Sequence, residues 1–201
     1  MELGAHPINL GIARDDLEEI KQKLREGLRV ADVVITTGGT SVGVSDLVPS
    51  AVSQLGSPGV IVHGVAIRPG MPTGLAILNG KPVAMLSGNP VAAMVGFEAF
   101  VRPILLSLMG VGAEPRPLLR ARITRRVASA LGRRVYLRVW AFRRGDEFFA
   151  EPVRVTGSGV ITTMTKANGF VIIPEDVGGL EEGELVTVHL FDTVGLEPPS
   201  N

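Results

Sequence analysis

The stretch VVITTGGTSVGVSD, residues 33–46, places a glycine- and hydroxyl-rich loop directly after an apolar run. The apolar residues predict a buried strand of a parallel sheet. Gly38 and Gly39 can reach positive φ and allow close approach, so that successive amide hydrogens can point at one anion. Hydroxyl donors flank them at Thr36, Thr37, Thr40 and Ser41. The stretch therefore predicts a phosphate or nucleotide cradle at the carboxyl end of a strand.

A second loop, RPGMPTG at residues 68–74, follows a later predicted strand. Pro69 and Pro72 fix φ and remove two backbone donors, which makes a rigid turn around Gly70. Arg68 can present a fixed cation to a phosphate. A simple hairpin connection would also explain this loop when it is taken alone.

The third loop begins the segment SGNPVAAM, residues 87–94. Asn89 is expected to be the N-cap of a helix, and Pro90 to occupy the first helical position. A helix N-terminus offers free amides and the positive end of a dipole, which suits an anion. Capping alone would also explain the Asn-Pro pair, but three such loops at strand ends favour a common site.

Strands and helices alternate along the first half of the chain, which predicts parallel pairing through crossovers. Helices are expected over residues 15–28, 46–55 and 91–110, and strands over residues 6–13, 31–37, 60–67, 73–78 and 82–87. Beyond residue 113 the pattern becomes a meander of short strands. We therefore expect a three-layer α/β domain with a mostly parallel sheet over residues 1–113. A small all-β barrel or sandwich is expected over residues 114–201.

The composition favours a globular protein of the cytoplasm. Apolar residues make up 45% and charged residues 20% of the 201 residues, the formal net charge is zero, and there is no cysteine. A zero net charge gives no general attraction to nucleic acid or to an anionic membrane. The apolar run 91–110 has Glu98, Arg102 and Pro103 in its middle, so it is expected to be a buried or half-buried helix.

The charges are unevenly distributed. Residues 116–144 hold ten arginines and no acid, whereas residues 175–201 hold seven acids and neither lysine nor arginine. Two solvated faces are the first explanation of this distribution, and arginines facing an anionic ligand are the alternative. The three histidines, His6, His63 and His189, are expected to be structural.

Taken together, the motifs resemble one family. GIARDD, DVVITTGGTSVGVSD, AIRPGMPTG and LSGNPVAAM occur in the order found in the molybdopterin-binding domain of MoeA-type molybdopterin molybdenumtransferases, and of the related gephyrin E domain. GRRVYLR at residues 132–138 and GSGVITTMTKANGF at residues 157–170 are similar to segments of that family's C-terminal β domain. The resemblance covers nearly the whole chain.

The resemblance implies an activity and a set of site residues. Family members use Mg²⁺ to cleave adenylylated molybdopterin, release AMP and insert molybdate or tungstate into the pterin dithiolene. Asp15 would contact magnesium or substrate, and Asp46 would have a catalytic role. The implied substrate-binding residues are Thr37, Gly38, Gly39, Thr40, Ser41, Gly43, Arg68, Pro69, Gly70, Pro72, Ser87, Gly88, Asn89, Pro90, Arg133, Arg138 and Ser158.

The chain also departs from the family pattern. Met71 stands where a lysine is usual, and Val44 where an acid is common. The resemblance implies that the first strand and helix of the α/β domain are missing, together with further N-terminal domains. The partner would then be a second copy in a homodimer, or the missing N-terminal region.

Three readings remain open. The chain is part of a metal insertase, or a module that binds the pterin nucleotide without turnover, or a relative of the MogA/MoaB adenylyltransferases. The β domain argues against the third reading, because those proteins usually consist of the α/β domain alone. The sequence does not separate molybdenum from tungsten.

Overall fold

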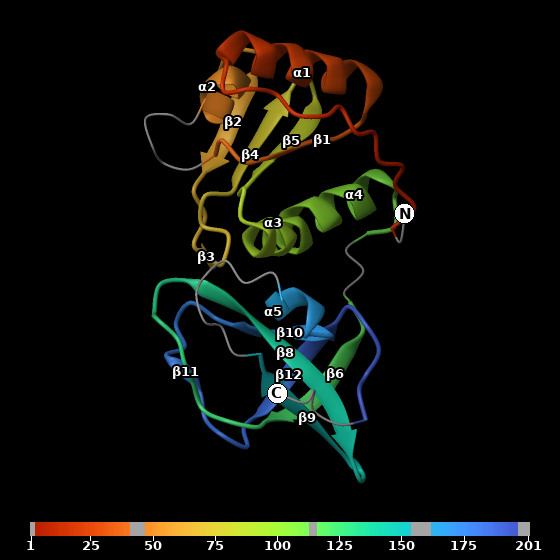
Figure 1. The fold of residues 1–201 in the computed structure, drawn as a ribbon, viewed down its shortest axis with the longest axis vertical. Helices are drawn as coiled ribbons and strands as arrows, with labels where there is room; N and C mark the ends of the chain where they lie inside the picture. Colours follow the sequence, from red (N-terminus) through yellow and green to blue (C-terminus); the bar gives the residue numbers. More distant parts are fainter. Residues whose placement is uncertain (1–2, 41–46, 113–115, 154–161, 197–201) are drawn as a thin grey trace. The chain divides into compact units, whose positions relative to one another are not determined.

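The computed structural model describes residues 3–40, 47–112, 116–153 and 162–196. The chain divides into two compact units, Met1–Val65 with Gly70–Glu114, and Ala66–Pro69 with Pro115–Asn201. Both units can be followed along the chain in Figure 1. Because Ala66–Pro69 leaves the first unit and joins the second, Arg68 belongs to the same unit as the C-terminal half of the chain.

The first unit is built on a four-stranded sheet in the order β1-β5-β4-β2. Its strands are β1 (Val34–Thr37), β5 (Lys81–Leu86), β4 (Gly74–Leu78) and β2 (Pro58–His63). The expectation of a mostly parallel sheet is wrong for the described strands, because only β1 and β5 pair in parallel. Asn79 and Gly80 join β4 to β5 with positive φ values of 52° and 80°. A two-residue turn of this kind can connect only antiparallel strands.

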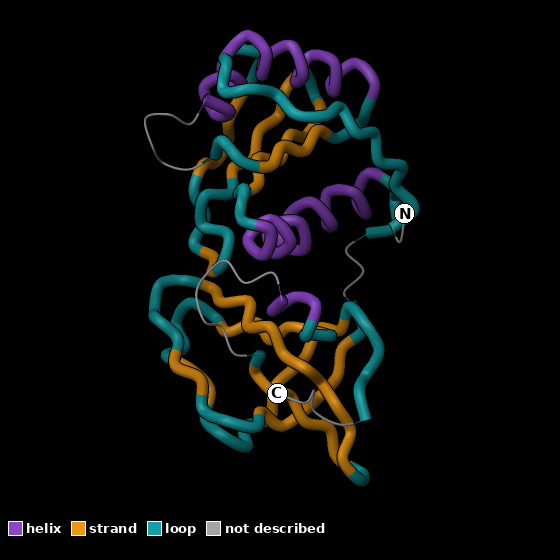
Figure 2. The backbone as a smooth tube through the Cα atoms, in the orientation of Figure 1, coloured by secondary structure: helices purple, strands orange, loops and turns teal. Residues whose placement is uncertain are grey.

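Helices cover both faces of this sheet (Figure 2). On one face, α1 (Leu17–Val30) and α2 (Leu47–Ser53) pack against β1, β4 and β5, with Val83 and Met85 of β5 in the shared core. On the other face, Ala84 and Leu86 of β5 pack with Val101 of the long helix Pro90–Leu108. This alternation along β5 follows the two-residue period of a strand.

The first helix, α1, begins after Asp16 rather than Asp15. The Asp16 Oδ1 atom accepts a hydrogen bond of 2.8 Å from the Glu19 amide, which makes Asp16 the N-cap. At the other end, Lys81 Nζ of β5 donates to the carbonyls of Leu28 and Ala31 at 2.7 and 2.8 Å. These bonds satisfy carbonyls that have no partner within the helix, and they place a cation at the negative end of its dipole.

The long helix contains α3 (Pro90–Gly96), a π-helical turn η1 (Phe97–Val101) and α4 (Arg102–Leu108). Pro103 offers no amide hydrogen to the preceding turn, and a π-helical turn accommodates such a residue. By length and composition alone the helix could cross a membrane. However, Val91, Val95 and Leu106 are buried, as in the half-buried helix that the sequence predicts.

Residues 6–13 form no strand, contrary to the sequence prediction. A strand needs a neighbour to pair with, and β1, at the end of the sheet, pairs with β5 alone among the described strands. The side chains of Ile8 and Ile12 are accordingly 50% and 92% exposed.

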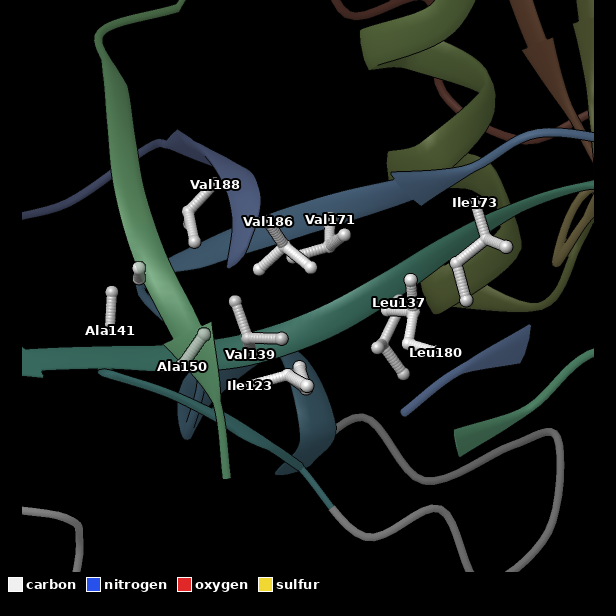
Figure 3. Packing of buried hydrophobic residues seen from close by; sticks show 11 residues of the cluster. Ile123, Leu137, Val139, Ala141, Ala150, Val171, Ile173, Leu180, Val186 and Val188 are labelled. Atoms are coloured by element: carbon white, nitrogen blue, oxygen red, sulfur yellow. The ribbon is translucent and has the colours of Figure 1, made fainter. Parts of the chain in front are cut away.

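The second unit is a closed β-barrel. Its strands are β6 (Leu118–Ile123), β8 (Arg134–Arg144), β9 (Glu147–Pro152), β10 (Gly169–Ile173) and β12 (Leu185–Leu190). The ring closes because β8 pairs with both β9 and β10. Two short strands, β7 (Val127–Ala128) and β11 (Gly179–Leu180), pair beside it, and α5 (Thr162–Thr165) precedes β10. Val139, Val186 and Val188 are among the side chains that fill the interior (Figure 3).

One buried amide side chain joins three segments of this unit. Asn168 is 1% exposed, and its Oδ1 atom accepts from the Ala141 amide at 2.6 Å. Its Nδ2 atom donates to the carbonyls of Ala141 and Thr193 at 2.7 and 2.9 Å. A buried side chain that makes three hydrogen bonds stabilises one particular arrangement of β8, the residue before β10 and the segment after β12.

Candidate functional site

The three predicted loops meet at one edge of the first sheet. For the proline-rich loop this holds only for Gly70–Thr73, because Arg68 and Pro69 belong to the second unit. β1 and β5 run in parallel and end opposite each other, at Thr37 and Leu86. Strand β4 runs the other way and begins at Gly74, opposite Met85 near the end of β5. The glycine loop, the Ser87–Pro90 loop and the return of the 64–73 loop at Gly70–Thr73 therefore all lie at the edge that the sequence analysis predicts.

The backbones of the glycine loop and the Ser87–Pro90 loop touch. A Cβ atom on Gly88 would lie 3.3 Å from the Gly38 Cα atom, and one on Gly39 only 2.9 Å from Val48 Cγ2. Gly38 and Gly39 have φ values of 86° and 62°, which side chains disfavour. Backbone conformation thus favours glycine at Gly38, space favours it at Gly88, and both favour it at Gly39.

The polar groups of the glycine loop divide into two sets. The Gly38 amide donates to the Leu86 carbonyl at 3.0 Å, so it is already used. The Thr40 hydroxyl donates to the same carbonyl at 3.2 Å, and the Thr40 residue is 2% exposed. The sequence alone suggests that this hydroxyl faces a ligand. In the structure it anchors the loop to β5 instead. Gly39 is exposed, and within the described part of the chain its amide forms no hydrogen bond, which makes it a candidate donor for an anion.

Asn89 caps the helix that follows. Its Oδ1 atom accepts from the Ala92 amide at 3.2 Å, and Pro90 occupies the first turn. The Ser87 hydroxyl accepts from the Asn89 amide, also at 3.2 Å. Ser87 and Asn89 therefore shape the turn that brings Gly88 against the glycine loop.

A hollow of about 510 Å³ opens beside the glycine loop. Its wall is formed by the segment 8–15, one side of α1 and residues 33–39. Asp15, Thr37, Gly38 and Gly39 line it, so the structure brings together four of the residues that the family resemblance implies. Asp15 is exposed and is not the helix cap, so its carboxylate remains available.

The proline-rich loop is divided between the two units. Gly70 and Pro72 stay with the first unit, where the Gly70 carbonyl accepts from the Thr73 amide at 3.0 Å and the Thr73 hydroxyl at 2.7 Å. Thr73 is completely buried. Met71, which stands where the family usually has lysine, is 41% exposed.

Arg68 and Pro69 belong to the barrel unit. Residues Ile67–Arg68 form β3, which pairs in parallel with the start of β8 so that Arg68 lies opposite Val135. Arg138, farther along β8, is 7% exposed. Its Nη1 atom donates to the Tyr136 carbonyl at 3.0 Å, while its buried Nε atom has no partner in the described part of the chain.

Burial lowers the pKa of the Arg138 guanidinium, and the positive charge of Arg68 lowers it further. Two like charges near each other, one of them buried with a donor that has no acceptor in the described part of the chain, form a favourable setting for an anion. Arg133, by contrast, is exposed just before β8 begins. The structure thus groups Arg68 with Arg138, although the two are 70 positions apart in sequence.

Some predicted site residues lie outside the described residues, namely Ser41, Gly43, Asp46 and Ser158. No three histidine, cysteine, aspartate or glutamate side chains cluster as metal ligands among the residues that the structure describes. Sequence reasoning missed Thr73, whose hydroxyl bonds the Gly70 carbonyl, and expected only a structural role for His63, whose Nε2 atom lies 2.9 Å from the Thr40 carbonyl oxygen. No local motif marks them, since their roles depend on contacts formed only in the folded sheet.

Two family models match the chain. Residues 1–107 match a model named MoCF_biosynth and described as "Probable molybdopterin binding domain". Residues 120–191 match a model described as "MoeA C-terminal region (domain IV)". The second match covers most of the barrel and supports the resemblance to MoeA over that to MogA/MoaB.

Similar proteins include molybdopterin enzymes and solved MoeA structures. The molybdopterin molybdenumtransferase of Bacillus subtilis is 34% identical over 95% of this chain and 44% of its own length. A Methanocaldococcus jannaschii protein named for molybdopterin biosynthesis is 43% identical over 90% of this chain and 42% of its own length. A crystal structure of a MoeA protein from Pyrococcus horikoshii is 40% identical, with a TM-score of 0.79 over 96% of this chain and 45% of that chain. The chain therefore spans less than half the length of these relatives.

Proposed function

We propose that the chain, which belongs to the MoCF_biosynth family of molybdopterin-binding domains, carries a pterin-nucleotide site. This site would be that of a MoeA-type molybdenumtransferase. The proposed reaction delivers molybdate or tungstate to adenylylated molybdopterin and releases AMP. The chain would act together with the further region that its longer relatives possess, or with a second copy.

The observation that carries the proposal is the contact between Gly38 and Gly88. It holds two loops together at the carboxyl ends of β1 and β5, beside a hollow lined by Asp15, Thr37 and Gly39. The exposed Gly39 amide, which has no acceptor among the described residues, is suited to a phosphate of a nucleotide. Cleavage of a phosphoanhydride depends mainly on donors and cations aimed at developing charge, so a site without a nucleophilic side chain suffices.

Arg68 and Arg138 would provide the anion site of the barrel unit. The buried Nε atom of Arg138 has no acceptor among the described residues, and a buried donor without an acceptor costs about 1–3 kcal/mol. A tetrahedral oxyanion such as molybdate or phosphate would supply that acceptor and offset the repulsion from Arg68.

Magnesium is part of the proposal. Mg²⁺ is usually held by one or two carboxylates together with substrate phosphates and water, so it does not require a cluster of protein ligands. Asp15, exposed at the wall of the hollow, would supply one carboxylate oxygen. Bound magnesium would neutralise the charge that develops on the phosphates.

The test is an assay of AMP release from adenylylated molybdopterin with molybdate and Mg²⁺. It is run with the chain alone and with the N-terminal region of the Bacillus subtilis relative supplied as a separate polypeptide. AMP release in the second mixture, abolished by omission of this chain, would support the insertase. Absence of AMP release in both mixtures would reject it.

The second candidate is a module that binds the pterin nucleotide without turnover. The exposed Met71 in place of the usual lysine favours it, because one phosphate cation is missing. Calorimetry with adenylylated molybdopterin separates the two, since this candidate predicts binding without AMP release.

The anion site has its own test. Arg138→Gln is expected to weaken calorimetric binding of molybdate at least tenfold, whereas Arg144→Gln, on an exposed part of β8, is expected to leave it unchanged. Equal binding by both variants would reject the role of Arg138.

A further inference from the structure

One side chain joins the glycine loop to the 64–73 loop. His63 is the last residue of β2, and its Nε2 atom lies 2.9 Å from the Thr40 carbonyl oxygen. Because a carbonyl oxygen can only accept, the Nε2 atom must carry the hydrogen. In the neutral imidazole, Nδ1 is then left with a lone pair.

The backbone around His63 holds the other loop. His63 lies opposite Gly74 in the antiparallel pair of β2 and β4. The next two amides, of Gly64 and Val65, donate to the carbonyls of Thr73 and Met71 at 3.0 and 2.9 Å. A movement of His63 is thereby transmitted directly to both sides of the 64–73 loop.

The Thr40 carbonyl is the group whose direction matters most for an anion. A peptide carbonyl is the negative end of a dipole, and it would repel a phosphate if it turned into the cradle. Positive-φ glycines precede it, so the local backbone has little to prevent such a rotation. The Thr40 hydroxyl is anchored to Leu86 on β5, and the His63 ring holds the carbonyl toward β2.

We propose that His63 is a positioning residue that keeps the Thr40 carbonyl out of the phosphate cradle and couples the glycine loop to the 64–73 loop. The inference rests on the proposed function for its ligand, but the coupling itself is a property of the unliganded chain. The exposure of the rest of His63 fits a residue at the rim of a binding site.

Two substitutions separate the hydrogen bond from the bulk of the side chain. His63→Gln keeps an N–H donor at nearly the position of Nε2, whereas His63→Leu removes the donor. The matched control is His6→Leu, which makes the same change at an exposed position before α1.

The first readout needs no ligand. The Val48 amide donates to the Gly39 carbonyl at 3.3 Å, so its hydrogen exchange reports opening of the glycine loop. We expect exchange of this amide to be about tenfold faster in His63→Leu, as for loss of one hydrogen bond. In His63→Gln and His6→Leu it should stay within about threefold of the wild type. Unchanged exchange in His63→Leu would overturn the inference, whatever the chain binds.

Two further measurements complete the test. Nitrogen-15 spectra of the histidine rings should show His63 protonated at Nε2, and a neutral ring protonated only at Nδ1 would refute the geometry. Calorimetry with adenylylated molybdopterin should show about tenfold weaker binding by His63→Leu and near-normal binding by His63→Gln. Failure of the wild type to bind would reject the proposed function, whereas equal binding by the wild type and His63→Leu would reject the role of His63.

Discussion

Replacement of Asn168 by aspartate should destabilise the barrel strongly. The change keeps the shape of the side chain and the Oδ1 acceptor of the Ala141 amide, but it removes the Nδ2 donor. The Thr193 carbonyl, now 2.9 Å from Nδ2, would lose this donor, and the Ala141 carbonyl, now 2.7 Å from Nδ2, would keep only its 2.9 Å bond from the Gly195 amide. Each hydrogen bond lost in this way costs about 0.5–1.5 kcal/mol.

The two carbonyls do not contribute equally. Ala141 is fully buried, whereas Thr193 is exposed and its carbonyl can recruit water in part. Placing a carboxyl group at a position that is 1% exposed adds a desolvation cost. The sum is about 3–5 kcal/mol, a large part of the stability of about 5–15 kcal/mol that is typical of a domain.

The barrel carries its own probe for this measurement. Trp140 on β8 is the only tryptophan of the chain, so its fluorescence during urea unfolding reports the second unit. With a urea dependence of about 1–3 kcal/mol per molar, the midpoint should fall by about 2 M.

The control for this prediction removes an exposed hydrogen bond from the same barrel. Thr187→Val deletes the acceptor of a 2.9 Å bond from Arg120, and water can replace it, so a loss below about 0.5 kcal/mol is expected. If Asn168→Asp costs no more than Thr187→Val, the reasoning from buried hydrogen bonds is refuted.

Three further predictions concern other parts of the chain. Gly39→Ala combines positive φ with a clash against Val48, so it should lower the free energy of unfolding by about 2 kcal/mol. Urea unfolding followed by circular dichroism measures this loss. The control Gly11→Ala also has positive φ but open space around it, and it should cost about half as much. Lys81→Met removes two charge-assisted bonds at the end of α1 and should cost about 1–3 kcal/mol by the same measurement; an unchanged midpoint would contradict this. Burial lowers the pKa of His189 from its usual value of about 6.5. The unfolded chain therefore binds a proton at this residue at a higher pH than the folded barrel does, so the free energy of unfolding should fall as the pH drops below about 6.5. Tryptophan fluorescence should show a smaller fall for His189→Phe; an equal fall would exclude this histidine as the cause.

Local patterns predicted much of the α/β unit. The spacing of Leu17, Ile20, Leu24 and Leu28 indicates α1, and the apolar run before Gly38 indicates β1, because side-chain periodicity reflects a single buried face. Asn89 is the helix cap that its position before Pro90 predicts. These features depend on neighbours within a few residues along the chain.

Pairing between strands was harder to predict. Residues 6–13 have the composition of a strand, but they form none, because composition does not provide a neighbour to pair with. The sheet was expected to be mostly parallel because helices were assumed to separate its strands, whereas β4 and β5 are joined by two residues. A short turn decides strand direction more strongly than the overall alternation of elements does.

The sequence by itself determined the glycine loop, the cap at Asn89, the apolar faces of the helices and the family resemblance. All of these rest on residue types at short spacing, where backbone conformation and periodicity act locally. Only the tertiary structure decided that Gly88 touches Gly38, that Arg68 joins Arg138 in the barrel unit and that His63 holds Thr40. These contacts join residues far apart in the chain, and their geometry exists only once the strands have paired and buried their shared faces.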